Sequence, residues 1–166
     1  MEVTTRWPVA ALLALAGAGC KVAPSESSAP APSAATGAPA KMLLVDAPAE
    51  GHIDEIVRAE MTKATAARRR VVVYVGGTWC EPCQRFHHAA ERGELDATFP
   101  DVELFGFDID RDRDRLVTAG YTSKLIPLFA LPGPDGRASG KQVEGGIKGE
   151  GAVANIAPRL EQMLAE

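Results

Sequence analysis

The sequence predicts an α/β protein in which a central mixed β-sheet is flanked by helices, in the order β-α-β-α-β-α-β-β-α. Short uncharged apolar runs, of which Val71–Val75 is the clearest, are typical of strands buried on both faces. Between such runs lie segments with apolar residues at helical spacing, as in 52–69. Near the end of the chain, the Pro-Asp-Gly-Arg turn at 134–137 separates two strands and predicts an antiparallel hairpin.

Length and composition fit one domain with additional residues at one end. The 166 residues are 46% hydrophobic and 24% charged, which allows a core and an ordinary polar surface. The formal charge of −4 argues against nucleic acid as a partner. Three cysteines, Cys20, Cys80 and Cys83, are too few for a disulfide framework or a four-cysteine zinc site. We expect a monomer with no metal and no cofactor.

The N-terminal 19 residues resemble an export signal. Arg6 precedes the apolar run 9–18, which is too short for a dependable membrane span. The run ends in LAGAGC, which looks like a bacterial lipobox and predicts lipidation of Cys20, although Gly17 stands where that pattern prefers Leu. Cleavage after Ala18 by an ordinary signal peptidase and an uncleaved anchor remain alternatives.

Residues 20–40 are mostly Ala, Pro and Ser, and this composition predicts a disordered tether that cannot bury enough apolar surface to order itself. The predicted folded domain is therefore 41–166. A tether after a lipidated cysteine is suited to a domain held at a membrane, so we expect a lipoprotein of the bacterial cell envelope or periplasm.

Ahead of the cysteine pair, the sequence predicts an edge strand at Met42–Val45 and a helix over 52–69. The helix has one apolar face, made of Ile53, Ile56, Val57, Met61 and Ala64. We expect the basic run 68–70 in its last turn, as a solvated helix end that complements the helix dipole. A binding patch is the alternative interpretation of that run.

After the cysteines, alternating patterns continue to the C-terminus. A helix with Cys83, Phe86, His87 and Ala90 on one face should bend or end at Gly93, before a strand over Val102–Ile109. The alternating charges of 111–115 predict the solvated first turn of a short helix that Gly120 caps. Strands are expected at Pro127–Leu131 and Val143–Ile147. The last helix has its apolar face at Val153, Ile156, Leu160, Met163 and Leu164; Pro158 predicts either a kink or a start near Pro158 with Asn155 as cap.

The two cysteines of Trp79-Cys80-Glu81-Pro82-Cys83 stand between the buried strand and the next helix. Pro82 suits the first helical turn, where its missing N–H costs nothing. Unpaired N–H groups at a helix N-terminus favour a thiolate, so Cys80 is the predicted nucleophile and Cys83 the resolving thiol. A structural disulfide or half a metal site are alternatives. Because the loop is so short, cross-linking it would stabilise the fold little.

These motifs resemble those of the thioredoxin superfamily over roughly the last three-quarters of the chain. Trp-Cys-x-x-Cys after a hydrophobic strand is specific to it, and Ile126-Pro127 before an apolar run is a second match. The resemblance implies the thioredoxin fold, a cis proline at Pro127 packed against the disulfide, and exchange with disulfides or dithiols of partner proteins. It also places Gly145 or Gly146 near Pro127, leaving room for an extended substrate segment.

Three positions depart from the family pattern. Tyr74 replaces a buried acid that many thioredoxins use for proton transfer to the resolving thiol, and His88 replaces a helix proline. Glu81 stands where thioredoxins carry Gly. Its carboxylate repels a thiolate on Cys80, and no Lys or Arg lies between the cysteines to counter it.

Two side chains have competing interpretations. His87, one helical turn beyond Cys83, could assist proton transfer to that sulfur or be a satisfied core histidine. With the two thiols it would make a poor three-ligand metal site. Trp79 is expected as a packing lid beside the thiols, with ordinary core as the alternative.

The sequence therefore predicts an exported thiol–disulfide oxidoreductase that acts as a reductase in the cell envelope, supplied by an unidentified electron donor. A non-catalytic thioredoxin-fold binding module or metal chaperone is one rival interpretation. A thiol oxidase or isomerase is another.

Overall fold

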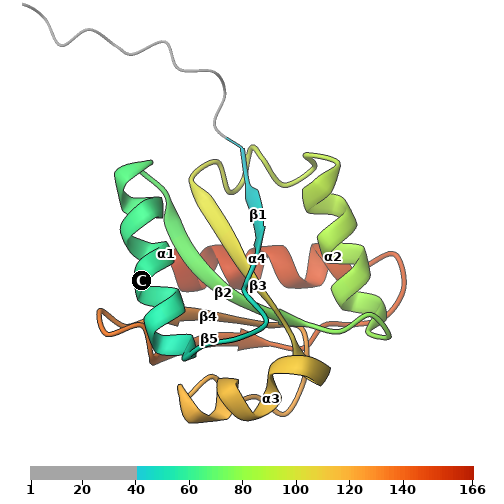
Figure 1. The fold of residues 1–166 in the computed structure, drawn as a ribbon. Coiled ribbons are helices and arrows are strands. Elements are labelled where there is room, and N and C mark those ends of the chain that lie inside the picture. The colour runs from blue at the N-terminus through green and yellow to red at the C-terminus, as the bar shows by residue number, and fades with distance from the viewer. Residues whose placement is uncertain (1–40) are drawn as a thin grey trace, which may run out of the picture. The chain divides into compact units, whose positions relative to one another are not determined.

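The structure, a computed structural model, describes residues 41–166 (Figure 1). The predicted export signal 1–19, the tether 20–40 and the lipidation residue Cys20 lie outside the described residues. The elements follow one another in the predicted order: β1 (Leu43–Asp46), α1 (Ile53–Ala66), β2 (Arg70–Gly76), α2 (Glu81–Glu91), β3 (Val102–Asp108), α3 (Ile109–Thr118), β4 (Leu128–Pro132), β5 (Ala138–Glu144) and α4 (Ala152–Ala165).

The five strands form a mixed sheet in the order β1-β3-β2-β4-β5. β1 and β2 run parallel to β3, while β4 runs antiparallel to both β2 and β5. Helix α1 connects β1 to β2 and helix α2 connects β2 to its parallel neighbour β3, and the antiparallel hairpin of β4 and β5 closes the sheet. This arrangement confirms the predicted thioredoxin fold. It also confirms the edge position of β1 and places the strand that leads into the cysteines, β2, in the middle.

Helices cover both faces of the sheet, and the alternation along β2 divides the core into two clusters. Val72 and Tyr74 face α2 and α4, where they pack in a cluster with Phe86 and Leu160. Residues 71, 73 and 75, all valines, belong to the cluster on the face of α1 and α3. Because both faces are covered, β2 is buried from Val71 to Gly76, as its uncharged sequence predicts. Among residues 41–166, no helix is both long and apolar enough to cross a membrane.

The basic run 68–70 lies beyond helix α1, which corrects its predicted position in the last helical turn. The helix ends at Ala66, and Arg68 takes a left-handed conformation with φ of 59° that turns the chain toward β2. Arg69 then donates to the carbonyl of Lys41, and Arg70, the first residue of β2, donates to that of Leu164. Two of the three arginines thus fasten chain segments to one another.

Two predictions in the C-terminal part are also corrected. The last strand was expected at Val143–Ile147, but β5 ends at Glu144 because Gly145, with φ of 69°, leaves the extended conformation. The last helix begins at Ala152 and contains Pro158, so a start near Pro158 is wrong.

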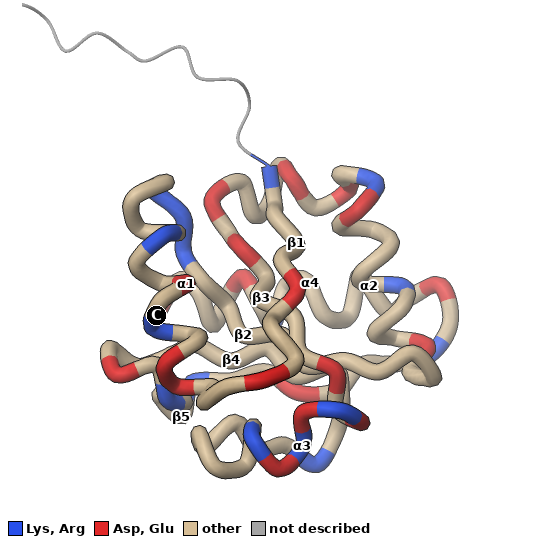
Figure 2. The backbone as a smooth tube through the Cα atoms, viewed as in Figure 1, with Lys and Arg blue, Asp and Glu red and all other residues tan. Residues whose placement is uncertain are grey.

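The alternating charges after β3 are not all solvated, contrary to the sequence-based expectation. Figure 2 shows acidic and basic residues interspersed along α3. Arg111, Arg113 and Asp114 are exposed as predicted. Asp112, however, is fully buried. The helix rotates this one carboxylate of the run toward the body of the domain, where it needs partners to compensate its lost hydration.

Candidate active site

The cysteine motif occupies the turn between the central strand β2 and helix α2. The N–H of Cys80 donates to the carbonyl of Gly77 at 3.0 Å, which closes the turn. Cys80 has extended backbone angles and is the N-cap of α2. Pro82 lies in the first turn, where it removes no helical hydrogen bond, as predicted. The buried strand and the helix start therefore fix the backbone on both sides of the cysteine pair.

Cys80 and Cys83 are joined by a disulfide, with their Cα atoms 5.2 Å apart. Both residues are buried, with 5% and 2% of their surface exposed. The Sγ of Cys80 accepts a hydrogen bond from the N–H of Cys83 at 3.3 Å. That donor and the other free N–H groups of the first helical turn would stabilise a thiolate at Cys80 in the reduced protein. Among the hydrogen bonds of residues 41–166, none has a helical N–H donating to the Sγ of Cys83.

The negative charge of Glu81 is countered by a cation that lies outside the stretch between the two cysteines. Its Oε1 lies 3.0 Å from Nε of Arg85, one helical turn on, and also accepts from the N–H of Gly149 at 3.1 Å. Arg85 in turn pairs with Glu150 at 2.7 Å. Hydrogen bonds from Arg85 and Gly149 hold the pKa of Glu81 below its ordinary value. No Lys or Arg lies between the cysteines, as the sequence shows, but Arg85 reaches Glu81 from the next turn of the helix and counters its charge.

Trp79 lies on the surface with 65% of its area exposed, so ordinary core is excluded for it. Its indole Nε1 donates to Oδ2 of Asp110 at 2.7 Å. Asp110 is held in place because Asp108 caps α3, accepting from the N–H groups of Asp110 and Arg111. The tryptophan beside the cysteines is thereby tied to the start of α3.

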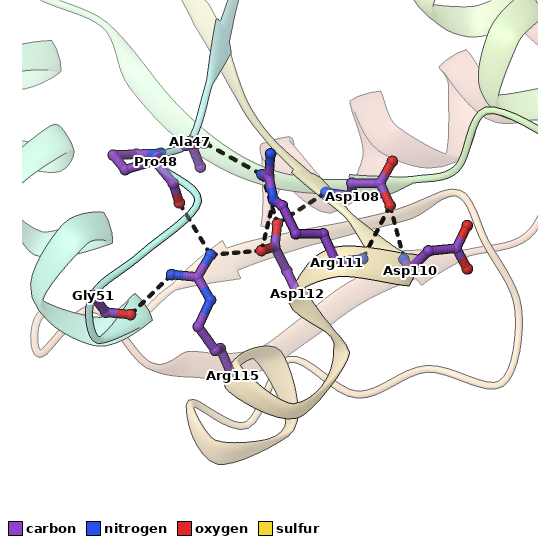
Figure 3. A network of polar contacts seen from close by, with 8 residues as sticks. All are labelled: Ala47, Pro48, Gly51, Asp108, Asp110, Arg111, Asp112 and Arg115. Carbon is purple, nitrogen blue, oxygen red and sulfur yellow. Dashed lines mark hydrogen bonds and ion pairs between the residues drawn. The ribbon is translucent and has the colours of Figure 1, made fainter.

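Buried Asp112 organises the same helix start (Figure 3). Its carboxylate oxygens lie 2.8 Å from Nη2 of Arg111 and 2.6 Å from Nη2 of Arg115, and they accept from the N–H of Asp108 at 3.1 Å. Burial alone raises the pKa of Asp112. The hydrogen bonds from the two arginines and from the Asp108 N–H outweigh burial and hold that pKa below its ordinary value.

The two arginines carry this network to the loop between β1 and α1, as Figure 3 shows. Arg115 donates to the carbonyls of Gly51 and Pro48 at 2.9 and 3.0 Å, and Arg111 reaches that of Ala47 at 3.4 Å. The turn that carries Asp110, and with it the anchor of Trp79, is thus fixed to a segment some sixty residues earlier in the chain.

Pro127 has the predicted cis peptide bond to Ile126. Its carbonyl accepts from the N–H of Gly145 at 2.8 Å, which confirms the predicted proximity of Gly145 to Pro127. A Cβ at Gly146 would lie 2.9 Å from Cδ1 of Ile156 and 3.3 Å from Cβ of Pro82. A side chain at Gly146 would therefore require Ile156 and Pro82 to shift.

Tyr74 stands at the position where many thioredoxins carry a buried acid, and it lies beneath the start of α2. Its hydroxyl donates to the carbonyl of Cys83 at 3.4 Å, and burial raises its pKa. The phenol is therefore a neutral donor, and it cannot serve as a base near neutral pH.

His87 is half-exposed, which excludes a fully buried core histidine. Its Nδ1 lies 3.5 Å from Oε1 of Glu91. His88 is exposed, as its place on the helix predicts. Within residues 41–166, no group of three or more His, Cys, Asp and Glu side chains is arranged to hold a metal ion.

The functional contacts that sequence reasoning missed are those of Arg85, Gly149 and Asp110. The spacing of Glu81 and Arg85, four apart on a predicted helix, was a readable signal for an ion pair. Gly149 and Asp110 carried no comparable signal, because each reaches the motif from a distant part of the chain.

Comparisons with known proteins give likeness in structure alone, since no family model and no curated protein sequence matches the chain. The thioredoxin NaTrxh of Nicotiana alata is 18% identical, with 78% of this chain and 95% of that chain covered and a TM-score of 0.47. Fasciola hepatica thioredoxin is 19% identical over 75% and 97%, with a TM-score of 0.46. Trichomonas vaginalis thioredoxin is 20% identical over 74% and 96%, with a TM-score of 0.45. The assignment of the thioredoxin fold rests on the strand order and pairing rather than on these values.

Proposed function

We propose that this protein is a thiol–disulfide oxidoreductase that acts on disulfides of other proteins. The observation that carries the proposal is the Cys80–Cys83 disulfide at the start of α2, with Cys80 as N-cap and Pro127 on the neighbouring loop. A disulfide that closes so short a loop adds little stability, so its chemistry is the better reason for its presence.

In the proposed reaction, the thiolate of reduced Cys80 attacks one sulfur of the substrate disulfide. A mixed disulfide forms and the first substrate thiolate leaves. Cys83 then attacks the Sγ of Cys80, the second substrate thiolate leaves, and the Cys80–Cys83 disulfide is formed. Two electrons pass from the protein dithiol to the substrate. Cys80 is assigned the first attack because the N–H of Cys83 donates to its sulfur.

An apolar rim beside the motif supports a polypeptide as the substrate. Trp79, Leu125 and Ile147 are large apolar residues with 65%, 61% and 52% of their surfaces exposed. Leu125 is adjacent to Gly145, whose N–H donates to the Pro127 carbonyl. An extended segment of a partner protein could cover these side chains while its disulfide lies against Cys80.

We infer further that the protein works as a reductase. Strongly oxidising members of the superfamily stabilise the thiolate greatly. Here Arg85 is shared between Glu81 and Glu150, so this cluster adds no net positive charge near Cys80, and the helix N-terminus is the main source of stabilisation. A dedicated donor of electrons, itself a dithiol, must then return the disulfide to its reduced form.

We propose the cell envelope as its location, with Cys20 lipidated and 20–40 serving as a tether to the membrane. The support is the composition of the N-terminal sequence, since these residues lie outside the part that the structure describes.

The proposal is tested by insulin reduction with dithiothreitol as the electron source. The protein should accelerate precipitation of the insulin B chain well above dithiothreitol alone, and Cys80→Ser should abolish the acceleration. Cys83→Ser should instead accumulate a mixed disulfide with the substrate, because the first attack is retained and its resolution is lost. A native protein with no acceleration would support a binding module without turnover.

A further inference from the structure

A cavity of about 470 Å³ borders the resolving cysteine. It lies between α2 and the part of the sheet formed by β1, β3 and β2, and residues from all four elements line it. Cys83 and His87 are both on its wall. One buried water needs only about 10–15 Å³ of such space, so the cavity can hold a chain of waters between the two residues.

His87 follows Cys83 by one helical turn, so the two side chains are neighbours on one face of α2. Helical side chains lean toward the helix N-terminus, which inclines His87 over the turn that carries Cys83 and Glu91 over His87. The 3.5 Å separation between Nδ1 of His87 and Oε1 of Glu91 fits this geometry. The Glu91 carboxylate therefore lies on the side of the imidazole that carries Nδ1.

Most of the other titratable side chains on the cavity wall are already engaged in hydrogen bonds or ion pairs. The phenol of Tyr74 is neutral and donates to the Cys83 carbonyl. Asp108, at the end of β3, caps α3. Arg111 is held by Asp112, while Asp46 belongs to the edge strand β1. Of the groups that remain, His87 is the one that follows Cys83 by one helical turn, whereas its exposed neighbour His88 projects from another side of α2 and Asp46 lies at the end of β1.

We propose that His87 accepts, through water in this cavity, the proton that Cys83 loses when it resolves the mixed disulfide. The inference rests on the proposed thiol–disulfide exchange and concerns its second step. As the Cys83 proton passes to the imidazole of His87, the Cys83 sulfur bonds to the Cys80 sulfur. The bond from Cys80 to the substrate sulfur breaks, and the substrate leaves as a thiolate. The imidazolium then releases its proton to solvent through the cavity.

The two steps can be separated with 5,5′-dithiobis(2-nitrobenzoic acid) and the pre-reduced protein in stopped flow. Attack by Cys80 releases one thionitrobenzoate, and resolution by Cys83 releases a second. At pH 7, His87→Gln should slow the second phase by at least about tenfold, as expected for loss of a general base, and change the first phase less than about twofold. His88→Gln is the matched control, one residue along on the same helix, and should change neither phase.

The pH dependence separates proton transfer from an indirect structural effect. Raising the pH ionises a growing share of any thiol without help from a base, so the His87→Gln defect in the second phase should become smaller as the pH rises. An unchanged second phase in His87→Gln, an equal defect in His88→Gln, or a defect of the same size at every pH would each overturn the inference. A native protein that releases no thionitrobenzoate at all would instead contradict the proposed exchange reaction, and the inference with it.

Discussion

The guanidinium of Arg85, one helical turn beyond Glu81, lies 3.0 Å from the Glu81 carboxylate. Glu81 thus contributes to the redox centre as half of an ion pair and not as a lone negative charge. Through its second bond, to the N–H of Gly149, it also connects the motif to the loop that precedes α4. Substituting one residue of the pair at a time therefore tests what each charge contributes to the reduction potential.

Neutralising each partner should move the reduction potential in opposite directions. Arg85→Gln leaves the Glu81 carboxylate uncompensated beside Cys80, which disfavours the thiolate and makes the couple more reducing. Glu81→Gln removes the negative charge nearest Cys80 and leaves Arg85 paired with Glu150 alone, which favours the thiolate and makes the couple more oxidising. Because both side chains are substantially exposed, shifts of about 10–20 mV are expected, or roughly two- to five-fold in the equilibrium constant with glutathione.

Arg92→Gln is the matched control for this pair. Arg92 follows the same helix and pairs with Glu94, so its loss is the same change of charge at the opposite end of α2. The reduction potential of the Arg92→Gln variant should equal that of the native protein. Shifts of the same sign in Arg85→Gln and Glu81→Gln would contradict the ion-pair interpretation.

Asp112→Asn should destabilise the domain at neutral pH by about 2–3 kcal/mol. The expected cost is below the about 3–5 kcal/mol of a wholly buried pair, because Arg111 and Arg115 are partly exposed and can turn to water. The folded pKa of Asp112 is lowered, so its contribution is complete above the unfolded value near 3.8 and is lost as pH falls through the folded pKa. Urea unfolding at pH 7 and pH 3 should show the difference between variant and native protein shrinking at the lower pH.

The contribution of Glu103 to stability should depend on pH in the opposite sense to that of Asp112. It is 5% exposed, and its Oε1 has no hydrogen-bond partner among the described residues. Burial, together with the nearby Glu60 carboxylate, raises its pKa, so the folded state favours the protonated form. Glu103 therefore costs stability at neutral pH, and this cost disappears as pH falls through the raised folded pKa toward the unfolded value near 4.5.

Glu103→Gln should raise the free energy of unfolding at pH 7 by about 1 kcal/mol, since it removes a buried charge that lacks a full set of partners. The gain over the native protein should vanish near pH 4. A variant less stable than the native protein at pH 7 would show that Glu103 is compensated by contacts other than those described.

Lipidation at Cys20 predicts that the full-length protein expressed in a bacterium enters the detergent phase of a Triton X-114 extract. Cys20→Ala should block lipid-dependent processing and retain the signal segment, which mass spectrometry of the intact protein would detect. A native protein with an unlipidated N-terminus at Gly19 would instead indicate ordinary cleavage after Ala18.

The sequence predicted what depends on local pattern. The uncharged run of β2 identified a central strand, and the cysteine spacing with Pro82 identified the helix start, because both are properties of consecutive residues. The burial of Asp112 was not predictable in this way. Its partners lie on the same helix, but the reason for its burial is the β1–α1 loop, which the sheet brings beside α3. The hydrogen bond between Glu81 and Gly149 spans 68 positions and likewise depends on the completed fold.

The reduction potential of the Cys80–Cys83 pair, measured by equilibration with reduced and oxidised glutathione, tests the account most directly. A reductase with a neutralised charge pair beside Cys80 should have a reversible two-electron couple of about −200 to −270 mV. A potential near about −120 mV, in the range of the strongest oxidants of the superfamily, would contradict the reductase assignment, and the absence of a reversible couple would contradict redox function altogether.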